Sequence, residues 1–174
     1  MSRKPFVVVS GLPASGKSTL ARKIATVLDV PCIDKDDLLE RLFLTNAVSD
    51  PTQRRSLSRL ADLELMESAR RSRASVLVSW WRHPRSNADS GTPIKWLGEL
   101  HGPVVEVHCF CTPEVAVERF LARERHPGHL DSRWSREQLL EMFHNQAAYG
   151  PIYPDSAICI PTDHLTDVGP MTDE

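Results

Sequence analysis

The segment from Gly11 to Ser18 constrains the fold of this chain more than any other part of the sequence. It reads Gly-Leu-Pro-Ala-Ser-Gly-Lys-Ser and matches G-x-x-x-x-G-K-[ST], the Walker A or P-loop pattern. In this pattern, successive backbone N–H groups surround nucleotide phosphates, and glycines permit backbone angles that a Cβ would block. Lys17 can reach the outer phosphates as a point charge, and the Ser18 hydroxyl can ligate Mg²⁺. The residues expected at the nucleotide are Gly11, Leu12, Pro13, Ala14, Ser15, Gly16, Lys17, Ser18 and Thr19.

The residues on both sides of this segment supply the strand and the helix that a P-loop requires. Phe6-Val7-Val8-Val9 is a continuous apolar run of the kind found in buried strands. After the loop, Leu20, Ile24, Val27 and Leu28 recur at helical spacing and predict one apolar helix face. The alternative is a chance match in a Gly/Ser turn, and the strand, loop and helix in register argue against it.

Strand-like and helical segments alternate along the rest of the chain. We expect strands at 30–34, 75–79, 104–110 and 157–160, helices at 38–44, 51–73, 93–100, from 112 and from 135, and a short polar tail. This alternation predicts right-handed βαβ crossovers and a parallel sheet covered on both faces. The expected fold is a three-layer α/β/α P-loop domain with a five-stranded parallel sheet and a small helical lid near 119–134. With no linker or repeat, we expect one domain over 1–174.

Composition excludes several classes of protein. The chain has 174 residues, 41% of them hydrophobic and 25% charged, which is typical of a globular domain. A net charge of −2 provides no field that would attract nucleic acid or an anionic membrane. The sequence shows neither a membrane-spanning run nor a secretory signal, so we expect a cytoplasmic protein. Cysteines occur at 32, 109, 111 and 159, all within expected strands, and we interpret them as reduced and buried rather than zinc-binding.

Two aspartates follow the second strand, where ligands of parallel sheets bind. Asp34 is expected to hold Mg²⁺ through a bound water, and Asp36 to orient and deprotonate a substrate hydroxyl. Aspartate is also a preferred N-cap, so the alternative is that one of the two simply begins the next helix. Both roles can coexist, and the sequence does not decide which aspartate is the base.

Arginines gather where the helix from 112 ends. Arg123 and Arg125, followed by His126-Pro127-Gly128-His129, suit a lid that closes on the γ-phosphate and excludes water. The alternative is a solvated, arginine-rich helix end that is favourable to the helix dipole. Arg119 fits both descriptions equally. The lid histidines are interpreted as lid contacts or exposed side chains, because a metal site would need a better ligand set.

These motifs together resemble the small P-loop kinases of the nucleoside-monophosphate-kinase-like superfamily. That group includes shikimate and gluconate kinases, chloramphenicol phosphotransferase, zeta toxins and polynucleotide 5′-kinases. The resemblance rests on Gly11–Thr19, on Asp34-Lys35-Asp36-Asp37 and on the arginine-rich lid. It implies ATP with Mg²⁺ and transfer of the γ-phosphate to a hydroxyl of a small molecule. It also implies that Pro161-Thr162-Asp163 lies beside the adenine, so Thr162 is expected at the nucleotide.

The chain departs from this group at the end of the third strand. Many relatives carry an acid there, whereas this strand ends Val78-Ser79-Trp80-Trp81. Either Asp34 takes over the missing carboxylate's role, or Mg²⁺ is held weakly. Trp80 and Arg82 suggest a substrate wall instead, although paired tryptophans more often pack in a core. Arg59, on the long helix, is a further candidate for the acceptor site, and a solvated face is its alternative.

The leading hypothesis is an ATP-dependent kinase, acting as a monomer or homodimer, with Lys17, Asp36, Arg123 and Arg125 as catalytic residues. Its partner would be a small-molecule hydroxyl acceptor. A polynucleotide 5′-hydroxyl kinase is one alternative, but Leu39 stands where such enzymes carry an arginine, and we do not expect nucleic acid binding. The other alternative is a non-catalytic ATP-binding module, motivated by Ser79.

Overall fold

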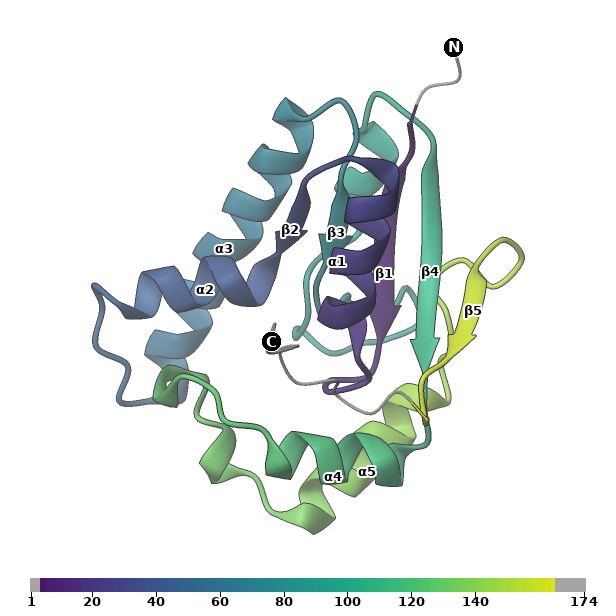
Figure 1. The fold of residues 1–174 in the computed structure, drawn as a ribbon. Helices are drawn as coiled ribbons and strands as arrows, with labels where there is room; N and C mark the ends of the chain where they lie inside the picture. The colour runs from purple at the N-terminus through teal and green to yellow at the C-terminus, as the bar shows by residue number, and fades with distance from the viewer. Residues whose placement is uncertain (1–3, 165–174) are drawn as a thin grey trace, which may run out of the picture.

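The computed structural model of the protein describes residues 4–164, and all its strands run parallel in one sheet. Their order is β2-β3-β1-β4-β5, so the P-loop strand lies at the centre (Figure 1). The strands are β1 (Phe6–Gly11), β2 (Cys32–Asp34), β3 (Val76–Val78), β4 (Val104–Phe110) and β5 (Ile158–Pro161). The helices are α1 (Lys17–Leu28), α2 (Lys35–Phe43), α3 (Pro51–Arg71), α4 (Pro113–Ala122) and α5 (Arg136–Ala147). Short 3₁₀ helices are η1 (Lys95–Glu99), η2 (Pro127–His129) and η3 (Asp131–Arg133).

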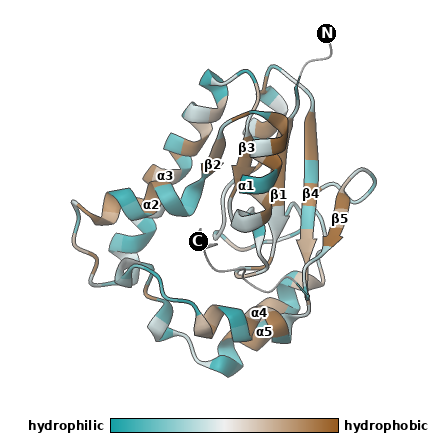
Figure 2. Ribbon diagram, viewed as in Figure 1, coloured by the Kyte–Doolittle hydropathy of each residue, from teal (hydrophilic) through white to brown (hydrophobic). Residues whose placement is uncertain are grey.

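Alternate residues of β1 point to opposite faces of the sheet and bury them in separate clusters. Val7 and Val9 pack with α1, whereas Phe6 and Val8 pack with α2, α3 and η1. The central strands are therefore hydrophobic on both faces, as Figure 2 shows for β1 and β3. This arrangement confirms the expected three layers.

The helices α4 and α5 pack together at the carboxyl ends of the strands rather than on a face of the sheet (Figure 1). Their shared core includes Val117, Phe120, Leu139 and Phe143, and it closes over Leu12 of the P-loop. The segment between the two helices, which contains η2 and η3, extends beneath α2 and α3 in this view. The expected lid therefore faces the edge of the sheet where the phosphate loop lies.

The helix starts follow the local signals in the sequence. Asp50 accepts hydrogen bonds from the N–H groups of Thr52 and Gln53 (2.8 and 3.0 Å) and caps α3, with Pro51 at the first helical position. Thr112 caps α4 in the same way. Ser135 and Gln138 form the expected capping box of α5.

Several expectations about individual elements were wrong. Helix α2 begins at Lys35 rather than 38, because Asp34 caps it through the Asp36 N–H. The segment 93–100 holds only the short 3₁₀ helix η1. Cys111 lies just beyond β4, and Cys159 is exposed because β5 is an edge strand.

The predicted apolar helix faces were only partly right. In α1 the small residues Ala21 and Ala25 are buried against the sheet, and Val27 is 83% exposed. Leu60 and Leu63 of α3, expected on its apolar side, are about half exposed. In both helices, the buried face is the one that carries the alanines, because small side chains let the helix approach the core closely.

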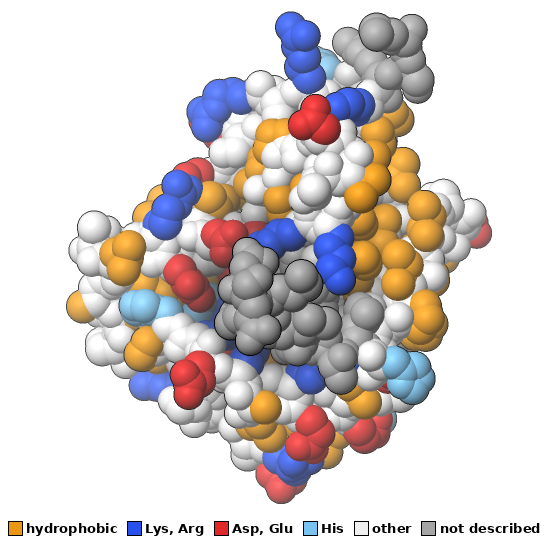
Figure 3. All heavy atoms as spheres, in the orientation of Figure 1, with side chains coloured by type: hydrophobic (Ala, Val, Ile, Leu, Met, Phe, Trp, Pro, Cys, Tyr) orange, Lys and Arg blue, Asp and Glu red, His pale blue; other side chains and the backbone are white. Residues whose placement is uncertain are grey.

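No helix within residues 4–164 is long and apolar enough to cross a membrane. On the face shown in Figure 3, basic and acidic side chains are interspersed. Hydrophobic side chains gather on the side where β4 and β5 lie, and Phe110 and Ile158 are among the exposed ones. The polar tail expected at the end of the chain lies, from residue 165 onward, outside the described residues.

Candidate active site

The P-loop adopts the backbone conformation that its sequence requires. Gly11, Ala14 and Gly16 all have positive φ angles, of 133°, 60° and 91°. A Cβ on Gly11 would lie 2.1 Å from the carbonyl oxygen of Cys109, so only glycine fits there. Helix α1 begins at Lys17 with no side-chain cap, and its first N–H groups have no acceptors within the helix. This turn into a helix N-terminus is the backbone arrangement that binds phosphate oxygens.

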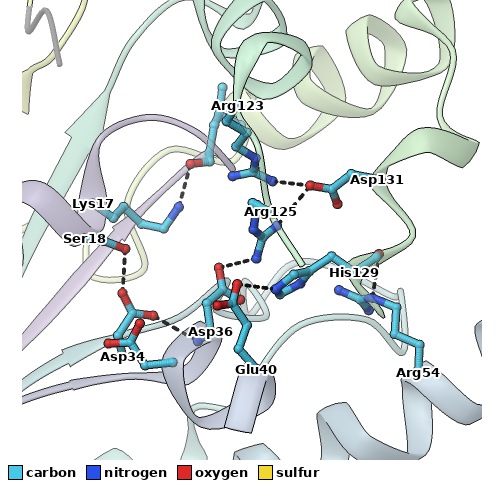
Figure 4. A network of polar contacts seen from close by, with 12 residues as sticks. Lys17, Ser18, Asp34, Asp36, Glu40, Arg54, Arg123, Arg125, His129 and Asp131 are labelled. Carbon is cyan, nitrogen blue, oxygen red and sulfur yellow. Dashed lines mark hydrogen bonds and ion pairs between the residues drawn. The ribbon is translucent and has the colours of Figure 1, made fainter. Parts of the chain in front are cut away.

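Lys17 folds back over the loop, and its Nζ donates to the carbonyl oxygen of Leu12 at 2.6 Å (Figure 4). Burial lowers the pKa of Lys17, while the negative charges of Asp36 and Asp34 oppose that shift. A desolvated ammonium with one carbonyl partner gains more from an anion than a solvated one does. The geometry therefore favours an anionic group beside Lys17.

Ser18 and Asp34 meet across the gap between the P-loop and β2. The Ser18 hydroxyl donates to Asp34 Oδ2 at 2.5 Å, and Asp34 Oδ1 accepts the N–H of Asp36 at 3.0 Å. Burial raises the pKa of Asp34, and the Ser18 hydrogen bond partly counters it. A hydroxyl beside a carboxylate is an oxygen donor set suited to Mg²⁺, so these residues fit the ion. Asp34 thus also serves as the helix cap that the sequence left as its alternative role.

Asp36 lies opposite the lid. Arg125 Nη2 is 2.6 Å from Asp36 Oδ2, and the same guanidinium reaches Asp131 through Nη1 at 3.3 Å. Arg123 also pairs with Asp131, at 3.2 Å. Partial burial of Asp36, whose side chain is 52% exposed, would raise its pKa, but the neighbouring Arg125, then His129, Lys17 and Arg123, outweigh this effect and the net shift is downward. Asp36 is therefore an anion held among cations at neutral pH.

The lid is anchored on α2 and α3. His129 is 2% exposed, and its Nε2 contacts Glu40 of α2 at 2.8 Å. Arg54 of α3 donates through Nε to the carbonyl oxygen of His129 at 2.9 Å. His129 is thus a buried lid contact, and the alternative of an exposed side chain is wrong. Arg54, rather than Arg59, is the α3 arginine that reaches the lid.

Among the side chains between residues 4 and 164, three buried polar atoms make no hydrogen bond, one of which is Nδ1 of His129. The other two are the Ser15 hydroxyl, inside the P-loop, and Nε of Arg123, in the lid. Buried polar groups are rarely left without a partner unless a ligand or water supplies one. Both can donate hydrogen bonds, as phosphate oxygens require.

A second region begins on the other side of the same loop. A cavity of about 550 Å³ is lined by Gly11 and Leu12, by Trp80 and Arg82 after β3, by the end of β4 and by α5. The structure therefore brings Trp80 and Arg82 together with the start of the P-loop. It does not place Lys17, Asp36, Arg123 or Arg125 on the lining of this cavity.

The two tryptophans after β3 have different surroundings. Trp81 is 6% exposed and donates its Nε1–H to the carbonyl oxygen of Val9 at 2.9 Å, so it also packs in the core. Trp80 is only half-buried and lines the cavity. Trp81 lines the cavity as well, so it fits both the core-packing and the substrate-wall alternatives, whereas Trp80 fits the second.

Arg82 and Arg59 share one carboxylate at the rim of the cavity. Asp89 accepts from Arg82 Nη2 at 3.1 Å and from Arg59 Nη2 at 2.9 Å. Arg82 also donates to the carbonyl oxygens of Ser90 and Gly91. Arg59 itself is exposed and does not line the cavity. The charge of Arg82 is therefore compensated within the protein.

Comparison with known proteins places this arrangement in a family. The family model AAA_33, described as an AAA domain, matches residues 6–148. The chain belongs to the AAA_33 family. The match covers the P-loop, β2 with its aspartates, the cavity wall and the lid.

Solved structures show the same fold as this AAA_33 domain. A provisionally named kinase of Chloroflexus aurantiacus j-10-fl superposes with a TM-score of 0.74 at 25% identity, covering 92% of this chain and 89% of that one. Shikimate kinase of Bacteroides thetaiotaomicron gives 0.57 at 18% identity, with coverage of 94% and 90%. A gluconokinase of Sinorhizobium meliloti 1021 gives 0.54 at 21%, with 93% and 85%. The expected P-loop kinase fold is confirmed.

A stretch of sequence also matches a curated relative. Over 37 residues the chain is 49% identical to shikimate kinase of Corynebacterium glutamicum, which is 21% of this chain and 22% of that enzyme. The match therefore spans about a fifth of the relative's length. The resemblance to small P-loop kinases, read from the motifs, is confirmed at the level of family and fold.

In this AAA_33 domain the strand-end serine is part of a buried polar network. Ser79 Oγ contacts Thr92 Oγ1 at 2.5 Å, and Thr92 donates to Asp62 of α3 at 2.6 Å. Asp62 pairs with Lys35 at 2.6 Å. Ser79 is thus engaged with Thr92, and the carboxylate beside Ser18 is Asp34. The sequence offered no signal for Lys35 and Asp62, which lie on different helices of the AAA_33 domain.

The loop after β5 is held against α4 by Arg119. Thr162 is buried and donates through both its N–H and its hydroxyl to the carbonyl oxygen of Phe110, at 2.8 and 3.1 Å. Arg119 donates to the carbonyl oxygens of Thr162 and Asp163, at 2.7 and 3.0 Å. Arg119 therefore positions this loop, which leaves Arg123 and Arg125 as the lid arginines that face Asp36.

Proposed function

We propose that this AAA_33 domain is an ATP- and Mg²⁺-dependent phosphotransferase that moves the γ-phosphate of ATP to a hydroxyl of a small molecule. The observation that carries this proposal is the connected set Ser18–Asp34–Asp36–Arg125, which joins the P-loop, β2 and the lid by contacts of 2.5 to 3.0 Å. It puts a hydroxyl–carboxylate pair, an ionised carboxylate and an arginine cation of the lid at one edge of the sheet. Family and fold support the same class of reaction.

The residues divide the work of phosphoryl transfer. The P-loop amides and Lys17 bind the phosphate chain of ATP, and Arg123 and Arg125 neutralise charge that spreads over the transferred group. The acceptor oxygen forms a bond to the γ-phosphorus as the bond to the β,γ-bridging oxygen breaks, and ADP leaves. Asp36 orients the acceptor hydroxyl and takes its proton. During this reaction, Arg125 gives up its ion pair with Asp36 and binds the transferred phosphate group instead.

Ser18 and Asp34 would hold Mg²⁺, Ser18 directly and Asp34 through a bound water. When bound, the ion neutralises the charge of the phosphate oxygens and fixes their orientation. Asp34 supplies the carboxylate that relatives carry at the end of the third strand. This assignment argues for a catalytic rather than a purely regulatory ATP-binding module.

The loop Pro161-Thr162-Asp163 completes the proposed nucleotide site. Because the Thr162 hydroxyl is bonded to Phe110, we propose that this loop contacts the adenine through its backbone and surface shape. No Asn-Lys-x-Asp guanine signature occurs in the sequence, which favours ATP over GTP.

Replacing the proposed base tests the function. Asp36→Asn keeps the volume of the side chain but cannot accept a proton, and we expect ADP formation with a pool of small-molecule alcohols to fall by roughly 10²-fold. Nucleotide binding, measured by calorimetry with a non-hydrolysable ATP analogue, should remain.

The matched control is Asp37→Asn, one position along the helix. Asp37 is exposed and contacts Arg22 at 3.5 Å, away from the lid. Equal activity in Asp36→Asn and Asp37→Asn would remove Asp36 from the mechanism. Failure of the unmodified protein to bind the ATP analogue would overturn the proposed function itself.

A further inference from the structure

The cavity beside the P-loop has the size and lining of a small-molecule site. Its volume of about 550 Å³ lies within the range of roughly 300–1,000 Å³ that is usual for ligand pockets. Trp80 and Trp134 both contribute aromatic surface to its lining, and both retain exposed area. Helix α5 turns one face toward the cavity, with Gln138, Glu141, Met142 and Asn145 at helical spacing.

The wall that carries Trp80 is rigid. The N–H of Thr92 donates to the carbonyl oxygen of Trp80, and the N–H of Arg82 donates to that of Thr92, both at 2.8 Å. Gly91 closes this loop with a φ of 85°, and a Cβ there would lie 3.0 Å from the backbone of Trp80 and Arg82. The backbone that carries Trp80 is therefore held in place without a ligand.

Among the charged side chains that line the cavity, the arginine is paired with an acid, and the other is itself an acid. Arg82 is neutralised by Asp89 and bonded to two carbonyl oxygens. His83 donates through Nε2 to the carbonyl oxygen of Pro151 and accepts the Arg85 N–H at Nδ1, which is the neutral tautomer. Glu141 adds an acid on α5. This lining does not suit a carboxylate or phosphate group.

At the floor of the cavity, a buried relay orients one imidazole. Both Glu106 oxygens accept backbone N–H groups, from Ile152 and Tyr153 at 2.9 and 2.7 Å, and Oε1 also accepts the Ser10 hydroxyl. Because the single Ser10 proton is used there, the 2.8 Å contact between Ser10 Oγ and His108 Nδ1 requires Nδ1 to donate.

The other nitrogen of His108 is then an acceptor. In the neutral ring, a proton on Nδ1 leaves Nε2 with a lone pair. Nε2 makes no hydrogen bond to the part of the chain that the structure describes, and His108 lines the cavity with a side chain that is 14% exposed. Burial lowers the pKa of His108, which keeps the ring neutral. A neutral acceptor in an aromatic cavity matches the hydroxyl of an uncharged molecule.

We infer that this cavity binds the phosphate acceptor as an uncharged, ring-containing alcohol, which stacks on Trp80 and donates one hydroxyl to His108 Nε2. The inference rests on the proposed function, since it names the acceptor class of the same enzyme. The cavity lining lacks Asp36, so the hydroxyl held by His108 is a positioning contact and a second hydroxyl of the acceptor is the one phosphorylated. His108 and Trp80 are thus specificity residues.

Binding of two classes of alcohol to the full-length protein tests this inference. The probes are uncharged aromatic diols, such as 4-(hydroxymethyl)benzyl alcohol, and the anionic polyols shikimate and D-gluconate. Binding is measured by calorimetry with Mg²⁺ and a non-hydrolysable ATP analogue present. We expect the aromatic diols to bind at least about tenfold more tightly than the anionic compounds, a difference of about 1.4 kcal/mol.

Variants of the two specificity residues localise the binding. His108→Phe keeps the ring but removes the acceptor, and we expect diol affinity to fall about tenfold; His108→Gln, which retains an acceptor oxygen, should recover part of it. Trp80→Leu should weaken binding by roughly three- to tenfold through lost stacking. The matched control is His144→Phe, because His144 is exposed on α5 and pairs with Glu114 outside the cavity.

Affinity of the ATP analogue separates the two proposals. If the analogue binds but no aromatic diol does, or if shikimate or D-gluconate binds more tightly, the inference about the acceptor is overturned and the proposed function stands. The same holds if His108→Phe and His144→Phe bind the diols equally. If the analogue does not bind the unmodified protein, the proposed function fails first.

Discussion

The phosphate loop separates two regions that differ in almost every physical respect. On one side, the Lys17 ammonium contacts the loop, and the anionic Asp36 pairs with the cationic Arg125. On the other side, the cavity is largely apolar, with several aromatic side chains, and its one Lys or Arg cation, among the residues described, is already paired. Electrostatic sites depend on individual charges, whereas apolar cavities depend on shape and on a few directed hydrogen bonds. The difference separates recognition of phosphate from recognition of the acceptor.

The largest effect should come from the charged side of the loop. Lys17→Ala removes the ammonium that faces the phosphates, and we expect phosphoryl transfer to fall by roughly 10²–10³-fold, the usual cost of losing a preorganised charge. ADP formation measures it. Binding of aromatic diols in the cavity should be unchanged, and a parallel loss of both would show that the two regions do not act separately.

Thiol labelling tests how closed the cavity side is. Burial raises the pKa of Cys109 to about 11, so at pH 8 only about 0.1% is thiolate, against roughly a quarter for a thiol with a pKa near 8.5. We expect iodoacetamide to modify Cys109 roughly 10²-fold more slowly than the exposed Cys159. Mass spectrometry of timed samples gives both rates. Equal rates would mean that the sheet edge opens readily to solvent.

The buried hydrogen bonds of Glu106 should contribute to the stability of the fold without affecting nucleotide binding. Glu106→Gln replaces one acceptor oxygen by an amide donor, which then faces an N–H or hydroxyl donor. We expect a loss of about 1–3 kcal/mol in the free energy of unfolding, measured in urea. Glu118→Gln, at an exposed ion pair with Arg136, is the control and should change it by less than about 0.5 kcal/mol. A reduced affinity for nucleotide in Glu106→Gln would contradict the separation.

The smallest effect should come from the rim. Asp89→Asn frees the charge of Arg82, so anionic ligands such as D-gluconate should bind more tightly, by less than about tenfold because the pair is exposed. The gain should disappear at high salt. Asp155→Asn, exposed and away from the cavity lining, is the matched control. No gain at low salt would mean that Arg82 is not a cation available to ligands.

The charged region was largely predictable, because its geometry follows from local pattern and from the topology of parallel sheets. Gly11 to Ser18 is one segment, and the carboxyl ends of β1 and β2 lie at one edge, which brings Ser18 to Asp34. The pairing of Arg125 with Asp36 joins residues far apart in the sequence and was not predicted, since the lid interpretation placed Arg125 only at the γ-phosphate. Arg54 and Arg59 could not be ranked, since helix orientation decides which of them reaches the lid.

The cavity was much less accessible to sequence reasoning. Ser10 and Glu106 are 96 residues apart, and Glu106 lies within an apolar run that indicates only a strand. The structural role of this buried acid can be recognised only when the three hydrogen-bond donors that face it are known. The apolar faces of α1 and α3 show the same limit, because Ala21, Ala25 and Ala61 are too small to dominate a hydrophobic pattern, yet they are fully or almost fully buried in the core.

Gly11 and Leu12 belong to both regions at once. The backbone of Gly11 presses on Cys109 so closely that no side chain fits, and the carbonyl oxygen of Leu12 is the one that Lys17 holds. A compound large enough to displace Leu12 from the cavity side, unlike a diol that fits the cavity, therefore moves the carbonyl oxygen that anchors the Lys17 ammonium. Such a neutral compound would weaken phosphate binding without imitating a nucleotide.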